Sequence, residues 1–267
     1  MCLLAFRLND HPTYDLVFAG NRDERYERPT SPASFWDDHP HVLAGRDLRA
    51  GGTWMGVTRT GRWGVITNVR DPGRVRADAP SRGHLVSKFL IQDGNPRAYV
   101  DAIAGTADRY NGFNLLVGAG STCAYLSNYR DGPETVTPGV HAISNATLDT
   151  SWPKTDRARD SLARKTTVST SPAKSGRVDP DDLLSMLDDR RRFPDDDLPD
   201  TGVGPEIESL LSPLFIESDA YGTRASTVLL IGKDGAITFV ERTFHHGTVA
   251  RTRRFDFDRL PTRASAD

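Results

Sequence analysis

The chain has 267 residues, enough for one large domain, and an ordinary composition with 37% hydrophobic and 26% charged residues. Its formal net charge of −2, from 34 basic and 36 acidic residues, creates no overall field that would attract nucleic acid or an anionic membrane. No apolar run approaches the roughly 20 residues of a membrane-spanning helix. Polar residues after Phe6 end the first apolar run too early for a signal peptide. We therefore expect a cytoplasmic protein with no nucleic-acid partner and no transmembrane segment.

The first half of the chain is predicted to be mostly β-structure in hairpins, followed by two helices. Four apolar segments bounded by polar turns are expected to be strands: 2–8, 14–19, 54–58 and 63–68. One helix follows Ser81 and has an apolar face, and a second begins at Asn95-Pro96 and runs towards Tyr110. The stretches 37–50 and 70–80 are expected to be loops.

The second half is predicted to return to hairpins, with two further helices. Strands are expected at 114–117, 123–128, 139–144, 227–232, 236–242 and 248–257. Helices are expected at 154–164 and 182–190, and exposed loops near 166–178 and 192–204. Strands that cluster into hairpins favour antiparallel sheets over βαβ units. The sequence therefore predicts an α+β fold, with residues 1–267 forming a single domain.

Cys2 is the first candidate functional residue because it directly follows the initiator methionine. Removal of Met1 is expected, since the second residue is small, and it leaves a thiol and a free α-amine on one residue. An α-amine has a pKa of about 7.7–8.0, so near pH 7 part of it is neutral and can take the thiol proton. The alternative is a structural cysteine in a strand, where a free thiol behaves as a small hydrophobe.

A polar cluster, Asn21, Arg22, Asp23 and Glu24, follows the second predicted strand. An antiparallel hairpin returns this cluster to the start of the chain, beside Cys2. Its charged side chains can hold the N-terminal amine and lower the pKa of the thiol. An exposed polar turn would have the same composition, so both interpretations stay open.

Two later strand ends carry polar residues of the same kind. Asn145 follows the predicted strand 139–144, and Arg224 precedes the strand 227–232. An asparagine amide can donate a hydrogen bond to a developing oxyanion, and an arginine can hold a carboxylate. Either residue can equally be a structural part of a strand end.

Neither a metal site nor a disulfide is predicted. The seven histidines show no ligand spacing, and the three aspartates at 195–197 lack the spacing of a calcium loop. Cys2 and Cys123 belong to no CxxC pair, and we expect both to be free thiols.

Five groups of residues together resemble the NRDE family, whose animal members are called transport and Golgi organisation protein 2. They span nearly the whole chain: Met1-Cys2, NRDE at 21–24, GGTWMGV at 51–57, SNA at 144–146 with WPK at 152–154, and YGTR at 221–224 with Ser226-Thr227. The family is similar to N-terminal nucleophile (Ntn) hydrolases of the cholylglycine hydrolase and penicillin V acylase type. The resemblance implies a four-layer αββα sandwich of two mostly antiparallel sheets.

The resemblance also implies roles for single residues. Cys2 corresponds to the nucleophile, Asn145 to the asparagine on the oxyanion side, and Arg224 to the arginine near the nucleophile. Asn68, at the end of a predicted strand, is the candidate for the remaining oxyanion position.

The NRDE segment itself departs from the pattern of these hydrolases. Asp23 corresponds to the aspartate that holds the N-terminal amine, and Glu24 is the alternative partner. The hydrolases carry an arginine three residues before that aspartate, but this chain has Gly20 there and its arginine at position 22. Asn21 and Arg22 are therefore kept as substrate-binding, oxyanion-binding or supporting residues and not as catalytic ones.

Two functions follow as hypotheses. The first is a cysteine-nucleophile hydrolase or acyltransferase acting on a non-peptide amide bond of a small molecule, which requires no cofactor. The second is a haem-binding or haem-trafficking protein on the same scaffold, with Cys2 or a histidine such as His141 as axial ligand. A membrane-trafficking scaffold is a third hypothesis, but the sequence has no lipid-binding helix or basic patch to support it. Neither the substrate nor the oligomeric state follows from the sequence.

Overall fold

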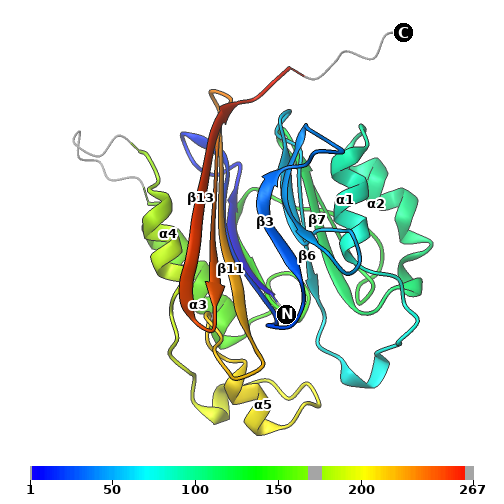
Figure 1. The fold of residues 1–267 in the computed structure, drawn as a ribbon, viewed down its shortest axis with the longest axis vertical. Helices are drawn as coiled ribbons and strands as arrows, with labels where there is room; N and C mark the ends of the chain where they lie inside the picture. Colours follow the sequence, from blue (N-terminus) through cyan, green and yellow to red (C-terminus); the bar gives the residue numbers. More distant parts are fainter. Residues whose placement is uncertain (1, 168–175, 262–267) are drawn as a thin grey trace.

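Two antiparallel sheets face each other in the computed structural model, which describes residues 2–167 and 176–261 (Figure 1). The first sheet has the order β10-β1-β2-β11-β12-β13 and the second the order β3-β4-β5-β6-β7-β8-β9. The strands of the first sheet are β1 (Cys2–Leu8), β2 (Tyr14–Arg25), β10 (Gly139–Ile143), β11 (Tyr221–Gly232), β12 (Ala236–His245) and β13 (Thr248–Asp258). Those of the second are β3 (Thr30–Phe35), β4 (Val42–Asp47), β5 (Met55–Thr58), β6 (Trp63–Asn68), β7 (Phe113–Ala119), β8 (Thr122–Ser127) and β9 (Glu134–Thr135).

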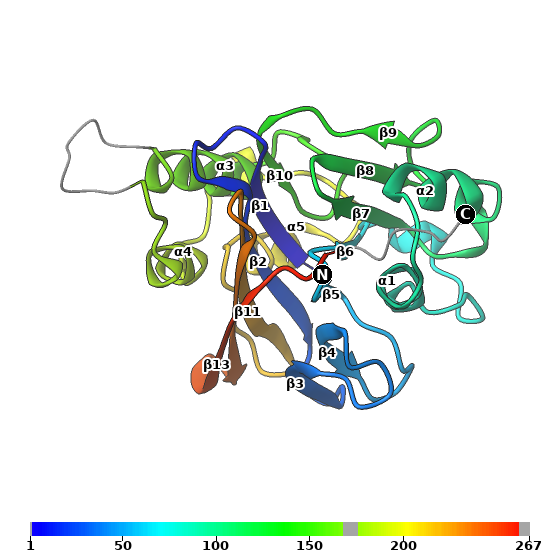
Figure 2. The same cartoon turned by 90° about the horizontal axis from the view of Figure 1, so that it is seen from above.

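Helices cover the outer face of each sheet. α3 (Pro153–Lys165) and α4 (Pro180–Leu187) pack on the first sheet, and α1 (Gly83–Ile91) and α2 (Pro96–Ala104) pack on the second. The resulting α-β-β-α order is visible in Figure 1 and, from above, in Figure 2. The expected four-layer α+β sandwich is confirmed. None of the helices described is long and apolar enough to cross a membrane.

Three apolar clusters fill the spaces between these layers. β1 illustrates the arrangement, because alternate side chains of a strand point to opposite faces of its sheet. Leu4 and Phe6 lie in the cluster between the two sheets. Leu3 and Ala5 lie in the cluster between the first sheet and its helices. Both faces of β1 are therefore buried, which fixes its register and with it the place of Cys2.

The structure corrects the prediction at several elements. The predicted loop at 37–50 contains β4, which pairs with the unpredicted β3. β3 contains Pro32 and has a register shift between Ser31 and Ser34, two features that obscure a strand in the sequence. β9 and the short helix α5 (Pro205–Leu210) were also not predicted.

Other differences concern the ends of elements. β2 continues to Arg25 and β11 begins at Tyr221, because these ends pair with each other. α2 ends at Ala104 and a 3-10 turn at Ala107–Arg109 follows, so the helix does not run on to Tyr110. The fourth helix covers Pro180–Leu187, not 182–190. Of the predicted loop at 166–178, residues 168–175 lie outside the described residues.

Candidate functional site

Strand register gathers most of the predicted site residues at one end of the first sheet. Cys2 of β1 is paired directly with Arg22 of β2. Asp23 of β2 is paired with Thr223 of β11, and the next pair is Ala225 with Arg22. Arg224 is therefore the extra residue of a β-bulge, and a bulge redirects the side chains around it.

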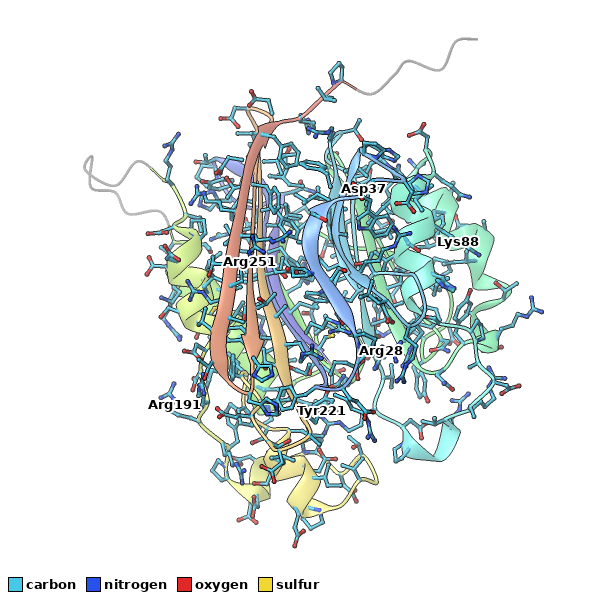
Figure 3. All side chains as sticks on the ribbon, viewed as in Figure 1. Arg28, Asp37, Lys88, Arg191, Tyr221 and Arg251 are labelled. Atoms are coloured by element: carbon cyan, nitrogen blue, oxygen red, sulfur yellow. The ribbon has the colours of Figure 1, made fainter. Side chains whose placement is uncertain are left out.

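These strand ends line a cavity of ≈ 630 Å³ between the two sheets. The predicted residues that line it are Cys2, Arg22, Asp23, Glu24, Asn68 and Arg224. Arg28, another lining residue, is seen at the lower end of the sandwich in Figure 3. The NRDE segment, the start of the chain and β11 thus meet around one cavity.

Asn145 lies beside the cavity without lining it. Its Nδ2 donates to the backbone carbonyl of Asn68 at 2.9 Å, and its Oδ1 accepts from Ser144 Oγ at 3.3 Å. Ser144 Oγ is also 3.2 Å from the backbone carbonyl of Cys2. Asn145 therefore connects β10, at the edge of the first sheet, to β6 of the second sheet.

Asn21 is a predicted residue whose side chain points away from the cavity. Its Nδ2 donates to the carbonyls of Leu187 and Leu214, at 2.9 and 2.8 Å, and its Oδ1 accepts from Ser226 Oγ at 2.6 Å. The side chain is fully buried and faces the helix layer. These bonds tie β2 to the end of α4.

Burial controls the protonation of the Cys2 thiol. The side chain is 7% exposed, and burial raises its pKa above the usual value for cysteine. The positive charge of Arg22 and the backbone N–H of Asp23 act in the opposite direction, because both favour the thiolate. The thiol is thus protonated at neutral pH, and a base is required to activate it.

Asp23 and Glu24 occupy different environments. Asp23 is buried, and its Oδ1 accepts a hydrogen bond from Thr223 Oγ1 at 2.7 Å. Burial raises the pKa of Asp23, whereas the positive charge of Lys154 and the Thr223 hydrogen bond lower it. Glu24 is 29% exposed and lies 3.8 Å from Arg22 and 3.9 Å from Arg28. Asp23 is therefore the carboxylate held inside the protein.

The cavity carries more arginines than carboxylates. Its lining includes six arginines, Arg22, Arg28, Arg46, Arg49, Arg82 and Arg224, and four acidic residues, Asp23, Glu24, Asp47 and Glu241. Arg28 is paired with Asp47 at 2.5 Å, and Arg46 with Asp38 at 2.7 Å.

Arg82 and Arg224 have no such carboxylate partner. Arg82 donates to the carbonyl of Gly112 at 2.8 Å, and Arg224 donates to the carbonyls of Arg25 and Arg28. Among the described residues no carboxylate lies within 4.0 Å of either guanidinium group. Burial lowers the pKa of both, yet an arginine remains charged at any physiological pH. The cavity is therefore suited to an anionic group.

Thr53 and Gly83 form one wall of the cavity, and the backbones of their two segments are in close contact there. A Cβ atom added to Gly52 would lie 2.6 Å from the backbone carbon of Gly83, at the start of α1. Thr53 N donates to the carbonyl of Gly83 at 3.3 Å. The glycine of the GGTW run thus allows the loop before β5 to meet α1 with no intervening side chain.

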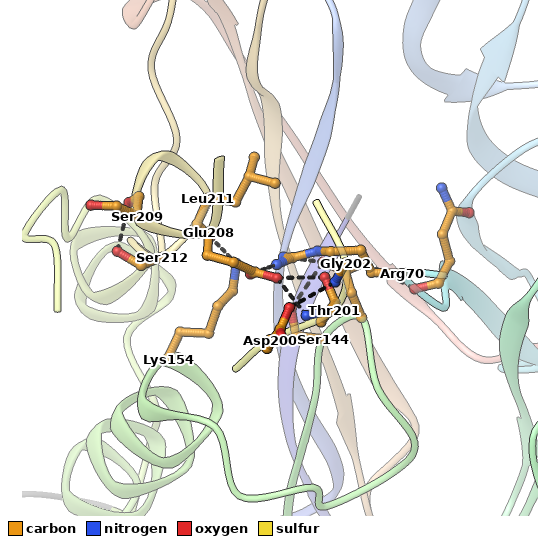
Figure 4. Close-up of polar contacts among 12 residues, drawn as sticks. Arg70, Ser144, Lys154, Asp200, Thr201, Gly202, Glu208, Ser209, Leu211 and Ser212 are labelled. Carbon is orange, nitrogen blue, oxygen red and sulfur yellow. Dashed lines mark hydrogen bonds and ion pairs between the residues drawn. The ribbon is translucent and has the colours of Figure 1, made fainter. Parts of the chain in front are cut away.

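Sequence reasoning missed a buried charged group behind Cys2 that consists of Arg70, Lys154 and Glu208. Lys154 is 4% exposed, its Nζ donates to the carbonyl of Leu211 at 2.7 Å, and burial lowers its pKa to about 8. Arg70 and Glu208 form an ion pair whose side chains are 6% and 4% exposed (Figure 4). Lys154 belongs to the WPK run of the NRDE resemblance, which was the one available sign of its importance.

Possible metal and haem ligands are few at the cavity. The described residues contain no group of three or more histidine, cysteine or acidic side chains that could hold a metal ion. His141 does not line the cavity, and its two ring nitrogens contact Asp149 Oδ2 at 2.7 Å and the carbonyl of Thr137 at 2.9 Å. His245 is a lining residue. Cys2 and Cys123 are both buried free thiols, as expected.

Comparison with known sequences gives a match over most of the chain. A family model described as "Transport and Golgi organisation 2" matches residues 1–246. The chain is 31% identical over 279 residues to "Transport and Golgi organization 2 homolog" of Mus musculus, covering 96% of this chain and 99% of the relative. It is 32% identical over 276 residues to the Homo sapiens homolog, with the same coverage of each chain.

Comparison with solved structures gives more distant likenesses. One is a Caenorhabditis elegans N-acylethanolamine-hydrolyzing acid amidase ortholog, with a TM-score of 0.46 and 10% identity over 86% of this chain and 92% of that chain. Another is a C2A mutant of conjugated bile acid hydrolase from Clostridium perfringens, with a TM-score of 0.41 and 7% identity over 99% of this chain and all of that chain.

Proposed function

The chain belongs to the Transport and Golgi organisation 2 family, and we propose that it is an N-terminal cysteine hydrolase or acyltransferase acting on a small-molecule amide. The observation that carries this proposal is the position of Cys2, whose side chain lines a cavity of ≈ 630 Å³ together with Asp23 and Arg224. A buried cysteine with only a structural role has no need of a cavity or of charged neighbours.

In the proposed reaction, removal of Met1 leaves the α-amine of Cys2 as the base. The sulfur of Cys2 attacks the carbonyl carbon of the substrate while its proton passes to this amine. The tetrahedral intermediate collapses, the C–N bond breaks, and the leaving amine takes the proton. The product is a thioester on Cys2, which water hydrolyses or a second nucleophile accepts.

The other predicted residues support this chemistry as follows. Asn145 has two amide N–H bonds, of which the carbonyl of Asn68 uses one, so the second can donate to the oxyanion. Asp23, buried next to Cys2 in the adjacent strand, holds the protonated amine. Arg22 and Arg224 contribute positive charge to the cavity.

The arginines indicate which substrates to test first. Arg82 and Arg224 line the cavity, and within the described ranges 2–167 and 176–261 no carboxylate lies within ion-pair distance of either. We therefore expect an amide that carries a carboxylate, sulfonate or phosphate group to react faster than a neutral amide of the same size.

The experiment is a comparison of wild type with Cys2→Ser, Cys2→Ala and Asn145→Ala. Each protein is incubated with a panel of anionic and neutral N-acyl compounds, and the adduct is measured by intact mass. We expect a Cys2 thioester in wild type, none in Cys2→Ala, and slower formation in Asn145→Ala. Absence of any adduct in wild type protein that has lost Met1 contradicts the proposal.

A second candidate function is the transfer of haem, which the volume and the charge of the cavity favour. Arginines can bind the two propionate groups of haem, and Cys2 or His245 can serve as an axial ligand from the lining. Titration with haem is expected to give a shifted Soret band that is lost in Cys2→Ser or His245→Ala. A spectrum that stays that of free haem at micromolar protein excludes this function.

A further inference from the structure

A buried ion pair lies behind the cavity, between Arg70 and Glu208. Arg70 lies two residues after the end of β6, and Glu208 belongs to α5, which lies outside the four layers (Figure 1). The backbone N–H of Thr201 donates to the second carboxylate oxygen of Glu208 at 2.9 Å, and the ring of Trp152 lies 5.3 Å from the guanidinium carbon of Arg70. Figure 4 shows both Arg70 and Thr201 joined by dashed lines to the carboxylate of Glu208. The Arg70 side chain is therefore held in one orientation.

Arg70 also contacts Asn145, the proposed oxyanion donor. The backbone N–H of Arg70 donates to the carbonyl of Asn145 at 2.8 Å. Its Nη2 donates to the Oδ1 of the Asn145 side chain at 3.4 Å. A guanidinium group can only donate hydrogen bonds, so it selects the oxygen end of the amide and excludes the nitrogen end.

The opposite end of the same amide is selected by a carbonyl. Asn145 Nδ2 donates to the backbone carbonyl of Asn68, which lines the cavity. A rotated amide would place Nδ2 against the Arg70 guanidinium and Oδ1 against the Asn68 carbonyl. Both contacts would then be repulsive.

Ser144 cannot fix this orientation alone. Its single hydroxyl proton is shared between two acceptors, the Cys2 carbonyl at 3.2 Å and Asn145 Oδ1 at 3.3 Å. A hydroxyl can also accept, so it tolerates either orientation of the amide. Arg70 at the oxygen end and the Asn68 carbonyl at the nitrogen end together specify the orientation of the Asn145 amide.

We propose that Arg70, held by Glu208 of α5, is a positioning residue that keeps the amide nitrogen of Asn145 on the side of Asn68, which lines the cavity. This inference rests on the proposed acyl transfer at Cys2. It assigns α5 and the Arg70–Glu208 pair a role in the reaction although neither touches the substrate.

Two reactions of the same thiol separate this role from a merely structural one. Acylation by p-nitrophenyl butyrate passes through an oxyanion, whereas alkylation by iodoacetamide displaces iodide and forms no oxyanion. Loss of an oxyanion donor therefore slows the first reaction and leaves the second unchanged. Loss of fold or of access to Cys2 changes both.

The variants are Arg70→Met, Arg70→Lys and Glu208→Gln, with Arg157→Met as the matched control. Arg157 also pairs with a carboxylate, that of Asp189 at 3.5 Å, and stacks on the aromatic ring of Phe193, while its side-chain hydrogen bond goes to Asp189. We expect Arg70→Met to lower the ratio of acylation to alkylation on the order of tenfold to a hundredfold, towards the value of Asn145→Ala. Arg70→Lys should recover part of the ratio, and Arg157→Met should keep the wild-type ratio.

The outcomes are distinguishable. An unchanged ratio in Arg70→Met and Glu208→Gln, with a lowered ratio in Asn145→Ala, overturns the role of Arg70 and leaves the proposed function standing. A wild type that is alkylated at Cys2 but never acylated overturns the proposed function and this inference with it. If Arg70→Met does not fold, the ratio of acylation to alkylation in Glu208→Gln decides whether Arg70 positions Asn145. That variant keeps the side-chain volume and removes only the charge.

Discussion

Cys2 and Cys123 are both buried free thiols in antiparallel strands, yet their surroundings differ in a decisive way. Cys123 in β8 is fully buried in the cluster between the sheets, and this burial raises its pKa. Cys2 in β1 touches the same cluster but also lines the cavity, and its pKa is affected by Arg22 and Asp23 as well as by burial. Burial alone therefore does not distinguish a structural cysteine from a reactive one; the charged neighbours and the access to a cavity do.

The largest expected effect is on chemical labelling of the two cysteines. Cys2→Ser should abolish acylation of the folded protein, and Cys123→Ser should leave it unchanged. The second change places a hydroxyl in an apolar core and should lower the free energy of unfolding by about 1–3 kcal/mol. Peptide mass mapping after labelling and urea denaturation measure the two effects. Labelling of Cys123 in the folded protein contradicts the contrast.

Lys154 provides the next test. It is a buried charged residue that interacts electrostatically with Cys2, whereas the pKa of Cys123 is raised by burial. Its pKa is lowered to about 8 from 10.5, so between these values the unfolded chain binds more protons than the folded protein. The contribution of Lys154 to stability therefore rises with pH across this window, by about 3 kcal/mol in total.

The matched variant is Lys154→Met, which keeps the length of the side chain. The free energy of unfolding of Lys154→Met minus that of wild type should be constant below pH 8 and should fall as the pH is raised from 8 to 10. Urea denaturation at several pH values measures it. A difference that does not change with pH means that Lys154 keeps an ordinary pKa.

Gly52→Ala tests whether the cavity wall depends on close backbone contact. The added Cβ would meet the backbone of Gly83 at 2.6 Å, so the loop or α1 must move. We expect a loss of about 1–3 kcal/mol in the free energy of unfolding and a changed rate of Cys2 alkylation. Gly105→Ala is the control, because a Cβ atom added at Gly105 meets nothing within 4 Å. Gly120→Ala is unsuitable, because Gly120 has a φ of 56°, which an alanine adopts only with strain. Equal stability of the Gly52 and Gly105 variants would falsify this account of the wall.

The smallest expected effect is that of Arg22→Gln on the thiol of Cys2. Burial raises the pKa of Cys2 and the charge of Arg22 lowers it, so removal of this charge should raise the pKa further. The pH profile of iodoacetamide alkylation should then move to higher pH, with a rate at pH 8 that falls by less than about tenfold. Alkylation rates between pH 6 and 10 measure this shift. A profile that moves to lower pH shows that Arg22 does not stabilise the thiolate.

Much of the architecture could be predicted, because apolar segments separated by turn residues indicate the hairpins. The predicted strands around Cys2 and the predicted helix after Ser81 are present, because apolar periodicity and turn residues specify them locally. β3 and β4 were missed, since Pro32 and a register shift interrupt the strand pattern of β3, and β3 pairs with β4 in spite of this interruption.

The site was predicted less completely, and strand length explains part of this. The second strand was predicted to end at residue 19, and the NRDE segment was predicted to be one polar cluster beyond it. In the structure β2 runs to Arg25, so successive side chains alternate between the two faces of the sheet. Asn21 consequently faces α4, while Arg22 is paired with Cys2.

Arg70, Lys154 and Glu208 escaped prediction for a different reason. Charged residues are usually exposed, and nothing in the local sequence indicates that these are buried. Their contacts come from α5, which was not predicted, and from segments that are distant in sequence. Such groups become visible only when the tertiary structure is known.

The most direct test of the central claim is the intact mass of the purified protein before and after incubation with an anionic N-acyl substrate. We predict a starting mass without Met1 and, after incubation, one added acyl group that maps to Cys2 and is absent in Cys2→Ala. A protein that retains Met1 completely, or a processed protein that never carries an acyl group on Cys2, contradicts it.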